Sequence, residues 1–202
     1  MTNKQEFAVA DWYTQHATAY AGTWDQVACP QLISFCALLP ENSKIADIAC
    51  GSGRDLMAGT ALGHNMFGTD ISEGQVTQSL THHEQVQVAS FDRLPYADNS
   101  MDGVWAKAAI VHSTVTQTTA GLREWLRVSK PGALLHVDAK LCDGSVDGDG
   151  FDPSGRWFQF LTPEELSQLV TDAGWIVEAR SIVDDTVRDF IKWSEVLARK
   201  PL

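Results

Sequence analysis

Long apolar runs are missing from this sequence of 202 residues. No stretch approaches the roughly 18 uninterrupted apolar residues that a membrane-spanning helix requires. The opening residues, MTNKQEF, also lack the apolar core of a secretion signal. We therefore expect a cytoplasmic protein that does not enter a membrane. Its hydrophobic content of 44% is sufficient for a single globular core.

Cysteine is scarce and unpaired in the sequence. The four cysteines, Cys29, Cys36, Cys50 and Cys142, form no C-x-x-C pair and stand in apolar or motif contexts. Such a distribution is typical of reduced thiols in a cytosolic protein. It argues against a disulfide framework and against a zinc site, so we expect no bound metal.

Basic charge is also in short supply. Lys and Arg number 15 against 26 Asp and Glu, which gives a formal net charge of -11 at pH 7. Binding to DNA or RNA depends on clustered Lys and Arg that displace counterions from the phosphates, and the sequence contains no such cluster. Nucleic acid is therefore a disfavoured partner. A local basic groove, or a purely solubilising role for the acidic excess, is still compatible with the composition.

The apolar pattern of the chain changes near residue 44. Before it, helical spacing predicts helices over 6–20 and 30–39, which would form an N-terminal cap over residues 1–43. After it, residues 44–202 alternate short apolar strands with helical segments, as in a parallel sheet with crossover helices. The predicted strands are 44–49, 66–70, 85–90, 102–106, 133–139, 176–182 and 193–199, and the predicted helices between them are 54–62, 73–81, 119–128 and 163–173.

The stretch from Asp143 to Gly155, DGSVDGDGFDPSG, is rich in Gly and Asp and predicts an irregular surface loop. Its acidic spacing does not fit that of an EF-hand, and no ligating Glu stands at the twelfth position. Calcium binding is therefore not expected there.

The most informative segment runs from Ile45 to Asp55, IADIACGSGRD, where an apolar strand ends in a glycine turn and passes directly into a helix. Gly51 and Gly53 remove side chains where a ligand must approach the backbone. The next strand ends in Asp70. Because the carboxyl ends of neighbouring parallel strands face one crevice, Asp70 is expected to reach the two hydroxyls of a ribose above the glycine turn. This order of elements predicts a nucleoside cofactor.

Two positions narrow the choice of nucleoside. Leu56 stands where a dinucleotide fingerprint has its third glycine, and Asp55 would repel a pyrophosphate from the first turn of the helix. A P-loop is excluded because no Gly-Lys-Ser/Thr follows the glycines. S-adenosylmethionine carries no phosphate, and its positive charges suit an acidic site that includes Asp47 and Asp70. It is the cofactor that we expect.

The segment from Asp47 to Asp55 resembles motif I of class I S-adenosylmethionine-dependent methyltransferases, usually D-x-G-C-G-x-G. Residues 68–72 resemble the G-x-D-x-S segment that follows it, residues 94–106 the run that ends in strand four, and residues 128–133 the turn before strand five. The similarity covers nearly the whole chain and extends, through residues 102–112, to small bacterial members. It implies a single doubly wound, Rossmann-like α/β domain, whose seven-stranded, mostly parallel sheet has one antiparallel strand and helices on both faces.

The resemblance also implies a set of cofactor contacts. Ala49 replaces the first glycine of motif I, and its methyl group would lower cofactor affinity unless the site accommodates it. After strand three, where related enzymes often place an acid that binds adenine, this chain has Ser90, Phe91 and Asp92 as candidates, and Phe91 is equally suited to core packing. The motif positions expected to contact the cofactor are Asp47, Ala49, Gly51, Gly53, Asp70, Ile71 and Ala106.

His112 is the candidate catalytic residue. It follows the fourth strand, where a neutral imidazole facing the crevice would act as a general base or contact the acceptor, although a lone histidine is often structural. Lys140 and Arg156 lie near the predicted acceptor side, where they favour an anionic group on the acceptor or form surface ion pairs. Tyr13, which shares a helical face with Trp12, would cover the site or pack in the core.

These features predict transfer of a methyl group from S-adenosylmethionine to a small organic acceptor, with release of S-adenosylhomocysteine. Two alternatives stay open. One is a tRNA wobble-uridine carboxymethyl O-methyltransferase, a class whose C-terminal half has a comparable aromatic segment before an E-E-L helix. The other is a non-catalytic cofactor-binding module. The acceptor atom, the pathway and the oligomeric state have no readable signal in the sequence.

Overall fold

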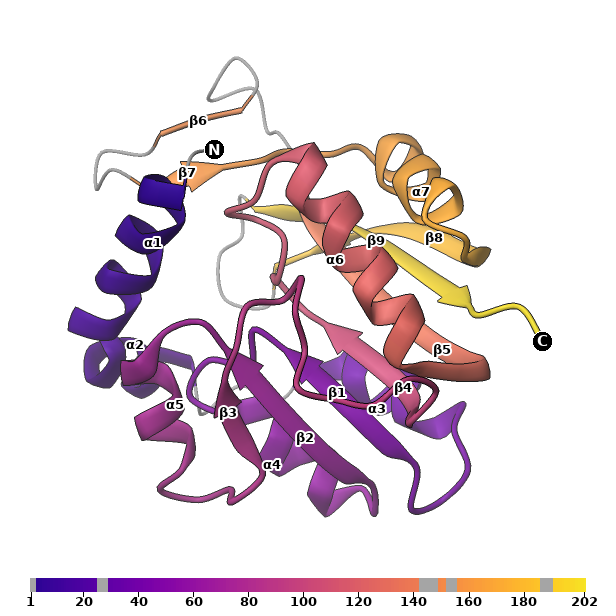
Figure 1. Ribbon diagram of the computed structural model, residues 1–202, viewed down its shortest axis with the longest axis horizontal. Helices are drawn as coiled ribbons and strands as arrows, with labels where there is room; N and C mark the ends of the chain where they lie inside the picture. Colours follow the sequence, from indigo (N-terminus) through magenta and orange to yellow (C-terminus); the bar gives the residue numbers. More distant parts are fainter. Residues whose placement is uncertain (1–2, 25–28, 142–148, 152–155, 186–190) are drawn as a thin grey trace.

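A seven-stranded sheet in the order β3-β2-β1-β4-β5-β9-β8 forms the centre of the molecule (Figure 1). The computed structural model describes residues 3–24, 29–141, 149–151, 156–185 and 191–202. The strands of the sheet are β1 (Lys44–Ile48), β2 (Asn65–Asp70), β3 (Val86–Val88), β4 (Met101–Ala106), β5 (Ser129–Leu141), β8 (Ile176–Asp184) and β9 (Lys192–Arg199).

The strand directions confirm the predicted topology. β1 pairs in parallel with β2 and β4, and parallel pairing continues from β2 to β3 and from β4 to β5. β9 is antiparallel to both β5 and β8, so it is the one antiparallel strand of the sheet. The strand order reverses at β1, and open α/β sheets bind ligands at such a switch point. The doubly wound α/β fold expected from the sequence is therefore correct.

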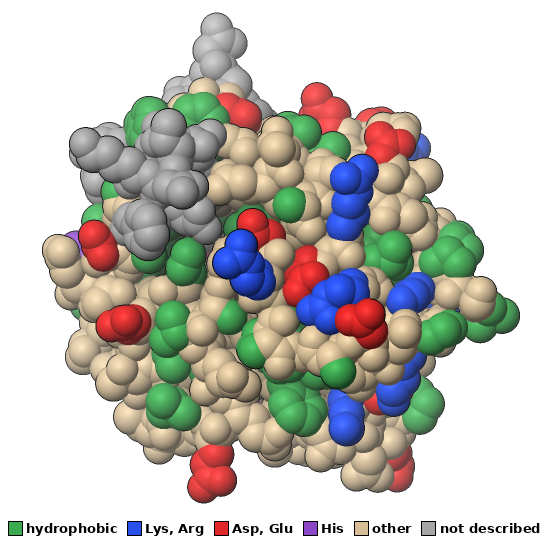
Figure 2. Space-filling model, in the orientation of Figure 1, with side chains coloured by type: hydrophobic (Ala, Val, Ile, Leu, Met, Phe, Trp, Pro, Cys, Tyr) green, Lys and Arg blue, Asp and Glu red, His purple; other side chains and the backbone are tan. Residues whose placement is uncertain are grey.

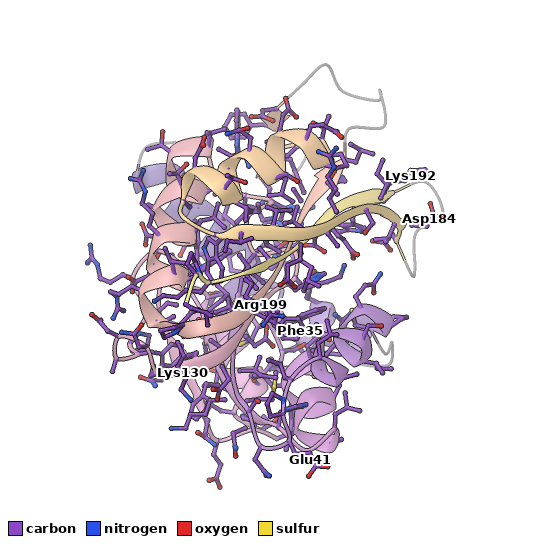
Figure 3. All side chains as sticks on the ribbon, turned by 90° about the vertical axis from the view of Figure 1, so that its right-hand side faces the viewer. Phe35, Glu41, Lys130, Asp184, Lys192 and Arg199 are labelled. Carbon is purple, nitrogen blue, oxygen red and sulfur yellow. The ribbon has the colours of Figure 1, made fainter. Side chains whose placement is uncertain are left out.

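Helices cover both faces of the sheet, as the side view in Figure 3 shows. Successive side chains of a strand point to opposite faces. Leu135 and Val137 of β5 pack in the core beneath α6 and α7, whereas Leu134 packs in the core beneath α3 and α4. These helices are α3 (Pro30–Ala37), α4 (Arg54–Ala61), α6 (Val115–Val128) and α7 (Pro163–Asp172).

The single helix predicted over residues 6–20 is two helices in the structure, α1 (Asn3–Gln15) and α2 (Ala17–Trp24). The break lies at His16, whose ring Nδ1 donates a hydrogen bond to a backbone carbonyl one turn earlier, at 2.8 Å. A cationic or polar side chain that satisfies a terminal carbonyl favours the end of a helix. Both helices lie against α5 (Glu73–Ser79) (Figure 1). The predicted boundary between cap and core stays a prediction.

A short hairpin replaces part of the predicted loop. Gly150–Phe151 (β6) pairs with Trp157–Phe158 (β7), although the sequence predicts irregular structure up to residue 155. The aromatic pair that faces across the hairpin explains the difference, because the ring centroids of Phe151 and Trp157 lie 5.3 Å apart. The first part of the predicted loop, which holds two of the aspartates weighed as calcium ligands, lies outside the described residues.

The start of α6 also differs from the prediction. The helix begins at Val115 rather than residue 119, because Thr114 caps it and accepts a hydrogen bond from the Gln117 amide at 3.3 Å. Within the described residues, no helix is long and apolar enough to cross a membrane.

Candidate active site

A cavity of about 300 Å³ opens at the carboxyl edge of the sheet, at the switch point. Its cofactor end is lined by residues that follow β1, β2 and β3, within 47–55, 70–75 and 89–91. Its acceptor end is lined by Tyr13, by residues between 107 and 112, and by side chains from β5, β7 and the β8–β9 hairpin.

The glycine turn after β1 is held by the carboxylate of Asp70. The Gly51 amide donates to Asp70 Oδ2 at 2.9 Å, and the Ser72 amide donates to Oδ1 at 2.8 Å. Burial raises the pKa of Asp70, and these backbone hydrogen bonds oppose the rise. Each carboxylate oxygen has a second lone pair, so the side chain can still accept from the hydroxyls of a ribose. Ile71 lies beside it in the cavity wall.

Gly53 packs against α5 in the structure, and its predicted contact with the cofactor stays a prediction. It does not line the cavity; it precedes α4 with a left-handed φ of +92°. A Cβ atom there would clash with Ser79 Oγ, and this φ strains any residue with a side chain, so glycine suits close packing of the turn against α5. Gly51, with φ +57°, does line the cavity.

Asp47 is a buried acid with an unsatisfied oxygen. Its Oδ2 has no hydrogen-bond partner among the described residues, and the side chain borders the cavity. Burial raises the pKa of Asp47 well above its usual range, and the neighbouring Asp55 raises it further. A cationic ligand in the cavity would stabilise the ionised carboxylate. The donor set therefore fits a cofactor that carries positive charge, as S-adenosylmethionine does.

Gln75 is a cavity residue that the sequence did not reveal. It is only 1% exposed, and neither atom of its side-chain amide has a hydrogen-bond partner among the described residues. Unsatisfied buried amides are costly and call for a partner. Gln75 stands three residues after Ser72, which caps α5, and a glutamine at this place in a helix gives no sequence signal for a ligand.

Asp55 is paired, contrary to the expectation that it would repel a phosphate. Arg54 Nε donates to Asp55 Oδ1 at 2.7 Å, and the indole of Trp105 donates to Oδ2 at 2.9 Å. The ion pair offsets much of the negative charge at the start of α4. The absence of a third glycine, rather than Asp55, is thus the stronger argument against a pyrophosphate.

The segment after β3 contributes one of its three candidates to the cavity. Phe91 lines the cavity and also packs on Gly121, where a Cβ atom would lie 2.5 Å from its ring. Ser90 donates to Asp92 at 2.6 Å, and neither residue lines the cavity. Ala106 is fully buried in the core and does not line it either.

His112 and Tyr13 meet at the acceptor end. The carbonyl oxygen of Trp157 can only accept, so His112 Nδ1 donates to it and Nε2 is the acceptor of the neutral ring. The Tyr13 hydroxyl donates to this Nε2 at 3.0 Å. Burial raises the pKa of Tyr13, which keeps the phenol protonated. Both nitrogens of His112 are thus engaged, and both His112 and Tyr13 line the cavity.

Phe158 organises the cations of the acceptor end. The Arg156 guanidinium lies 5.4 Å from the centroid of its ring and 4.2 Å from that of Trp12. Lys140 Nζ lies 4.8 Å from the Phe158 centroid, and the His112 ring meets it edge-on at 4.5 Å. All of the predicted acceptor residues, namely His112, Lys140, Arg156 and Tyr13, therefore line the same end of the cavity.

A buried cluster around Lys107 was not predicted. Lys107 Nζ lies 2.6 Å from Asp138 and 3.7 Å from Glu195, and Asp138 also accepts from the amide of Ala108. Asp138 and Glu195 lie near His136, with ligand-type atoms within 4.8 Å of one another, but the Lys107 ammonium already supplies the positive charge there. Buried charges inside the apolar strands β5 and β9 were the available signal.

On the face shown in Figure 2, the Lys and Arg side chains lie in the centre and right half, interspersed with Asp and Glu. Arg127 pairs with Asp98 and Glu124, and Lys130 pairs with Asp102. Basic side chains engaged in this way are poorly suited to follow a phosphate backbone.

Residues 46–137 match a protein family described as a methyltransferase domain. An O-methyltransferase of Pyrenophora dematioidea is 30% identical over 147 residues, which are 66% of this chain and 54% of that protein. A tRNA (carboxymethyluridine(34)-5-O)-methyltransferase of Macaca fascicularis is 32% identical over 111 residues, which are 54% of this chain and 16% of that protein. This chain spans about half the length of the first of these relatives.

A similar solved structure is that of 1,6-didemethyltoxoflavin-N1-methyltransferase from Burkholderia thailandensis, with bound 1,6-didemethyltoxoflavin and S-adenosylhomocysteine. Its TM-score is 0.77 at 15% identity, and the match covers 100% of this chain and 91% of that one. The fold is therefore shared. The match over residues 46–137 and the shared fold are consistent with a class I S-adenosylmethionine-dependent methyltransferase.

Proposed function

We propose that the protein transfers a methyl group from S-adenosylmethionine to a small organic acceptor and releases S-adenosylhomocysteine. The observation that carries this proposal is the continuity of one cavity, which joins the acids Asp47 and Asp70 to the Tyr13–His112 pair. We expect this activity in the cytoplasm. S-adenosylmethionine, when bound, supplies an electrophilic methyl group on a sulfonium.

The cofactor end would bind and orient S-adenosylmethionine. Asp70 is fixed by the amides of Gly51 and Ser72, so its free lone pairs are preorganised for ribose hydroxyls. Asp47 and the unsatisfied amide of Gln75 are suited to the cationic and polar groups of the methionine part. Preorganised donors and acceptors reduce the entropy lost on binding.

The acceptor end would move a proton. Because the Tyr13 hydroxyl already donates to His112 Nε2, an acceptor hydroxyl, amine or thiol would pass its proton to the Tyr13 oxygen while Tyr13 passes its own to the imidazole. The nucleophile gains the methyl group, and the proton ends on His112. The raised pKa of Tyr13 disfavours a free phenolate, so the two transfers are coupled. His112 then acts as the base through Tyr13 rather than by direct contact.

Lys140 and Arg156 favour an acceptor that carries an anionic group. Both cations are held against Phe158 beside His112, and their positive charge at this end of the cavity would attract carboxylate or phosphate oxygens. Two nearby acids of the cavity are engaged elsewhere, because Asp184 pairs with Lys192 and Asp185 accepts from the indole of Trp193. We therefore expect a small anionic acceptor.

A tRNA acceptor is the second candidate, favoured by the 32% identity to the tRNA methyltransferase of Macaca fascicularis. The net charge of -11 opposes it. Binding of bulk tRNA with a submicromolar dissociation constant at physiological salt would favour this alternative over a small molecule.

The cofactor proposal is tested by thermal unfolding of the purified protein with S-adenosylhomocysteine, with NAD as the control. A ligand at a hundredfold excess over its dissociation constant stabilises the folded state by about 2.7 kcal/mol. S-adenosylhomocysteine should raise the melting temperature, NAD should not, and Asp70→Ala should weaken the affinity by about 2 to 3 kcal/mol. Equal stabilisation of Asp70→Ala and the parent protein would mean that the ribose lies elsewhere. Incubation with a metabolite extract and S-adenosylmethionine then separates an enzyme, which releases S-adenosylhomocysteine, from a binding module.

A further inference from the structure

Helix α1 and the start of α5 touch backbone to backbone. A Cβ atom built on Gly74 would lie 2.6 Å from the carbonyl oxygen of Thr14 and 2.7 Å from its Cα. No side-chain rotation relieves a clash with backbone atoms, so only glycine allows this approach. The Gly74 amide also points at Thr14 Oγ1, at 3.4 Å.

The same contact reaches the cofactor end of the cavity. Thr14 Oγ1 lies 2.9 Å from Ser72 Oγ and shares a hydrogen bond with it. Ser72 caps α5, and its amide donates to the carboxylate of Asp70. Two hydrogen bonds therefore connect helix α1 to the acid that is expected to bind the ribose.

The neighbouring residue on α1 reaches the acceptor end. Tyr13 donates to His112 Nε2 at 3.0 Å, across 99 positions of the sequence. Successive residues of one helix, Tyr13 and Thr14, thus contact the two ends of the cavity. Displacement of α1 from α5 by even a fraction of a helical turn would break a hydrogen bond of this length.

We propose that Thr14 and Gly74 are positioning residues of the methyl-transfer site: docking of α1 on the turn from Asp70 to Gly74 brings the Tyr13 hydroxyl to His112. This inference rests on the proposed function. Cofactor that orders the Asp70 turn would then also order α1, because both share Ser72. Assembly of the acceptor end would follow occupation of the cofactor end.

Gly74→Ala tests this directly, with Gly22→Ala as its matched control. Gly22 lies in α2, and a Cβ atom there meets nothing within 4 Å. Hydrogen exchange is followed by mass spectrometry with and without S-adenosylhomocysteine. We expect exchange of the α1 amides to become at least tenfold faster in Gly74→Ala and to respond little to S-adenosylhomocysteine. Amides of β1 and β5 should keep the protection of the parent protein, and Gly22→Ala should behave as the parent.

Thr14 provides a second, milder test. Thr14→Val keeps the shape but removes the hydroxyl, so α1 should exchange several-fold faster, and Thr14→Ser should restore the slow exchange. Unchanged α1 exchange in both Gly74→Ala and Thr14→Val would overturn the proposal, as would equal loss of protection in α1, β1 and β5. Failure of the parent protein to bind S-adenosylhomocysteine would count against the proposed cofactor instead, since the effect of Gly74→Ala on α1 without ligand is measured independently.

Discussion

The two ends of the cavity are built from different kinds of contact. At the cofactor end, Asp70 is held by the backbone amides of Gly51 and Ser72, which belong to the same two strand ends. At the acceptor end, Tyr13 is held by the side chain of His112, and Arg156 by the face of Trp12. Backbone contacts survive most substitutions, whereas contacts between side chains are lost with either partner. The geometry of the cofactor end should therefore tolerate most substitutions, whereas the geometry of the acceptor end should change with them.

The largest effect is expected at the contact between Tyr13 and His112. Tyr13→Phe removes the oxygen that would receive the proton, and His112→Asn removes the base behind it, so each should lower turnover by roughly a hundredfold or more. Affinity for S-adenosylhomocysteine should stay within about twofold, because the cofactor end is untouched. Turnover with an acceptor from the metabolite screen and calorimetric titration measure the two quantities.

The double variant sharpens this test. Residues that act as one unit lose activity together, so the double variant should be about as slow as either single variant. Additive losses, or a turnover and Michaelis constant equal to those of the parent between pH 6 and pH 9, would return His112 to a structural role.

A smaller effect is expected from pH, which should change both the unfolding free energy and the affinity of the cofactor end for S-adenosylhomocysteine. The pKa of Asp47 is raised by burial, so the folded protein retains a proton that the unfolded chain loses above about pH 4. The unfolding free energy of the ligand-free protein should therefore fall as pH rises through that range. Binding of S-adenosylhomocysteine, whose ammonium favours the ionised acid, should strengthen with pH.

The Asp47→Asn variant distinguishes the contribution of Asp47 to the pH dependence from that of the other buried acids. The pKa of Asp70 is raised in the same direction, chiefly by its own burial, and Asp70 is retained in the variant, so it provides the internal background. The variant should unfold with a weaker dependence on pH and bind S-adenosylhomocysteine more weakly, with affinity nearly constant between pH 5 and pH 8. A pH dependence identical to that of the parent would assign the effect to another acid.

The smallest effect is expected at Ala49, whose φ of +55° is in the left-handed region. This conformation costs an alanine about 1 to 2 kcal/mol, and the greater freedom of glycine in the unfolded chain offsets roughly 0.5 to 1 kcal/mol of any gain. Ala49→Gly should raise the unfolding free energy by at most about 1.5 kcal/mol and strengthen cofactor binding a few-fold.

Ala108 provides the matched control, since its φ is also +55° but it lines the acceptor end. Ala108→Gly should change stability in the same direction and leave the affinity for S-adenosylhomocysteine unchanged. Denaturant titration and calorimetry of both variants make the comparison. Equal gains in affinity at both positions would show that relief of strain, rather than the Ala49 methyl group, determines binding.

The sequence predicted what is encoded in contiguous patterns. The strand and glycine turn that precede Asp55, and the acid at the end of the second strand, specify the switch point and the cofactor end because their geometry is local. The Lys107–Asp138–Glu195 cluster joins the turn after β4 to β5 and β9, so its members are neighbours only after the sheet has formed. His112 was found from its place after a strand, but its hydrogen bond to a helix 99 positions away leaves no trace in the sequence.

A mutation at Phe158 would change the acceptor end more than the cofactor end. One ring contacts Lys140, Arg156 and His112, so a single codon controls the placement of three polar groups at once. Selection for a new acceptor can therefore begin with one mutation that reshapes the pocket as a whole. Asp70 is held by the backbone amides of Gly51 and Ser72, which a mutation at Phe158 does not alter. A variant with a new acceptor can therefore keep the same methyl donor.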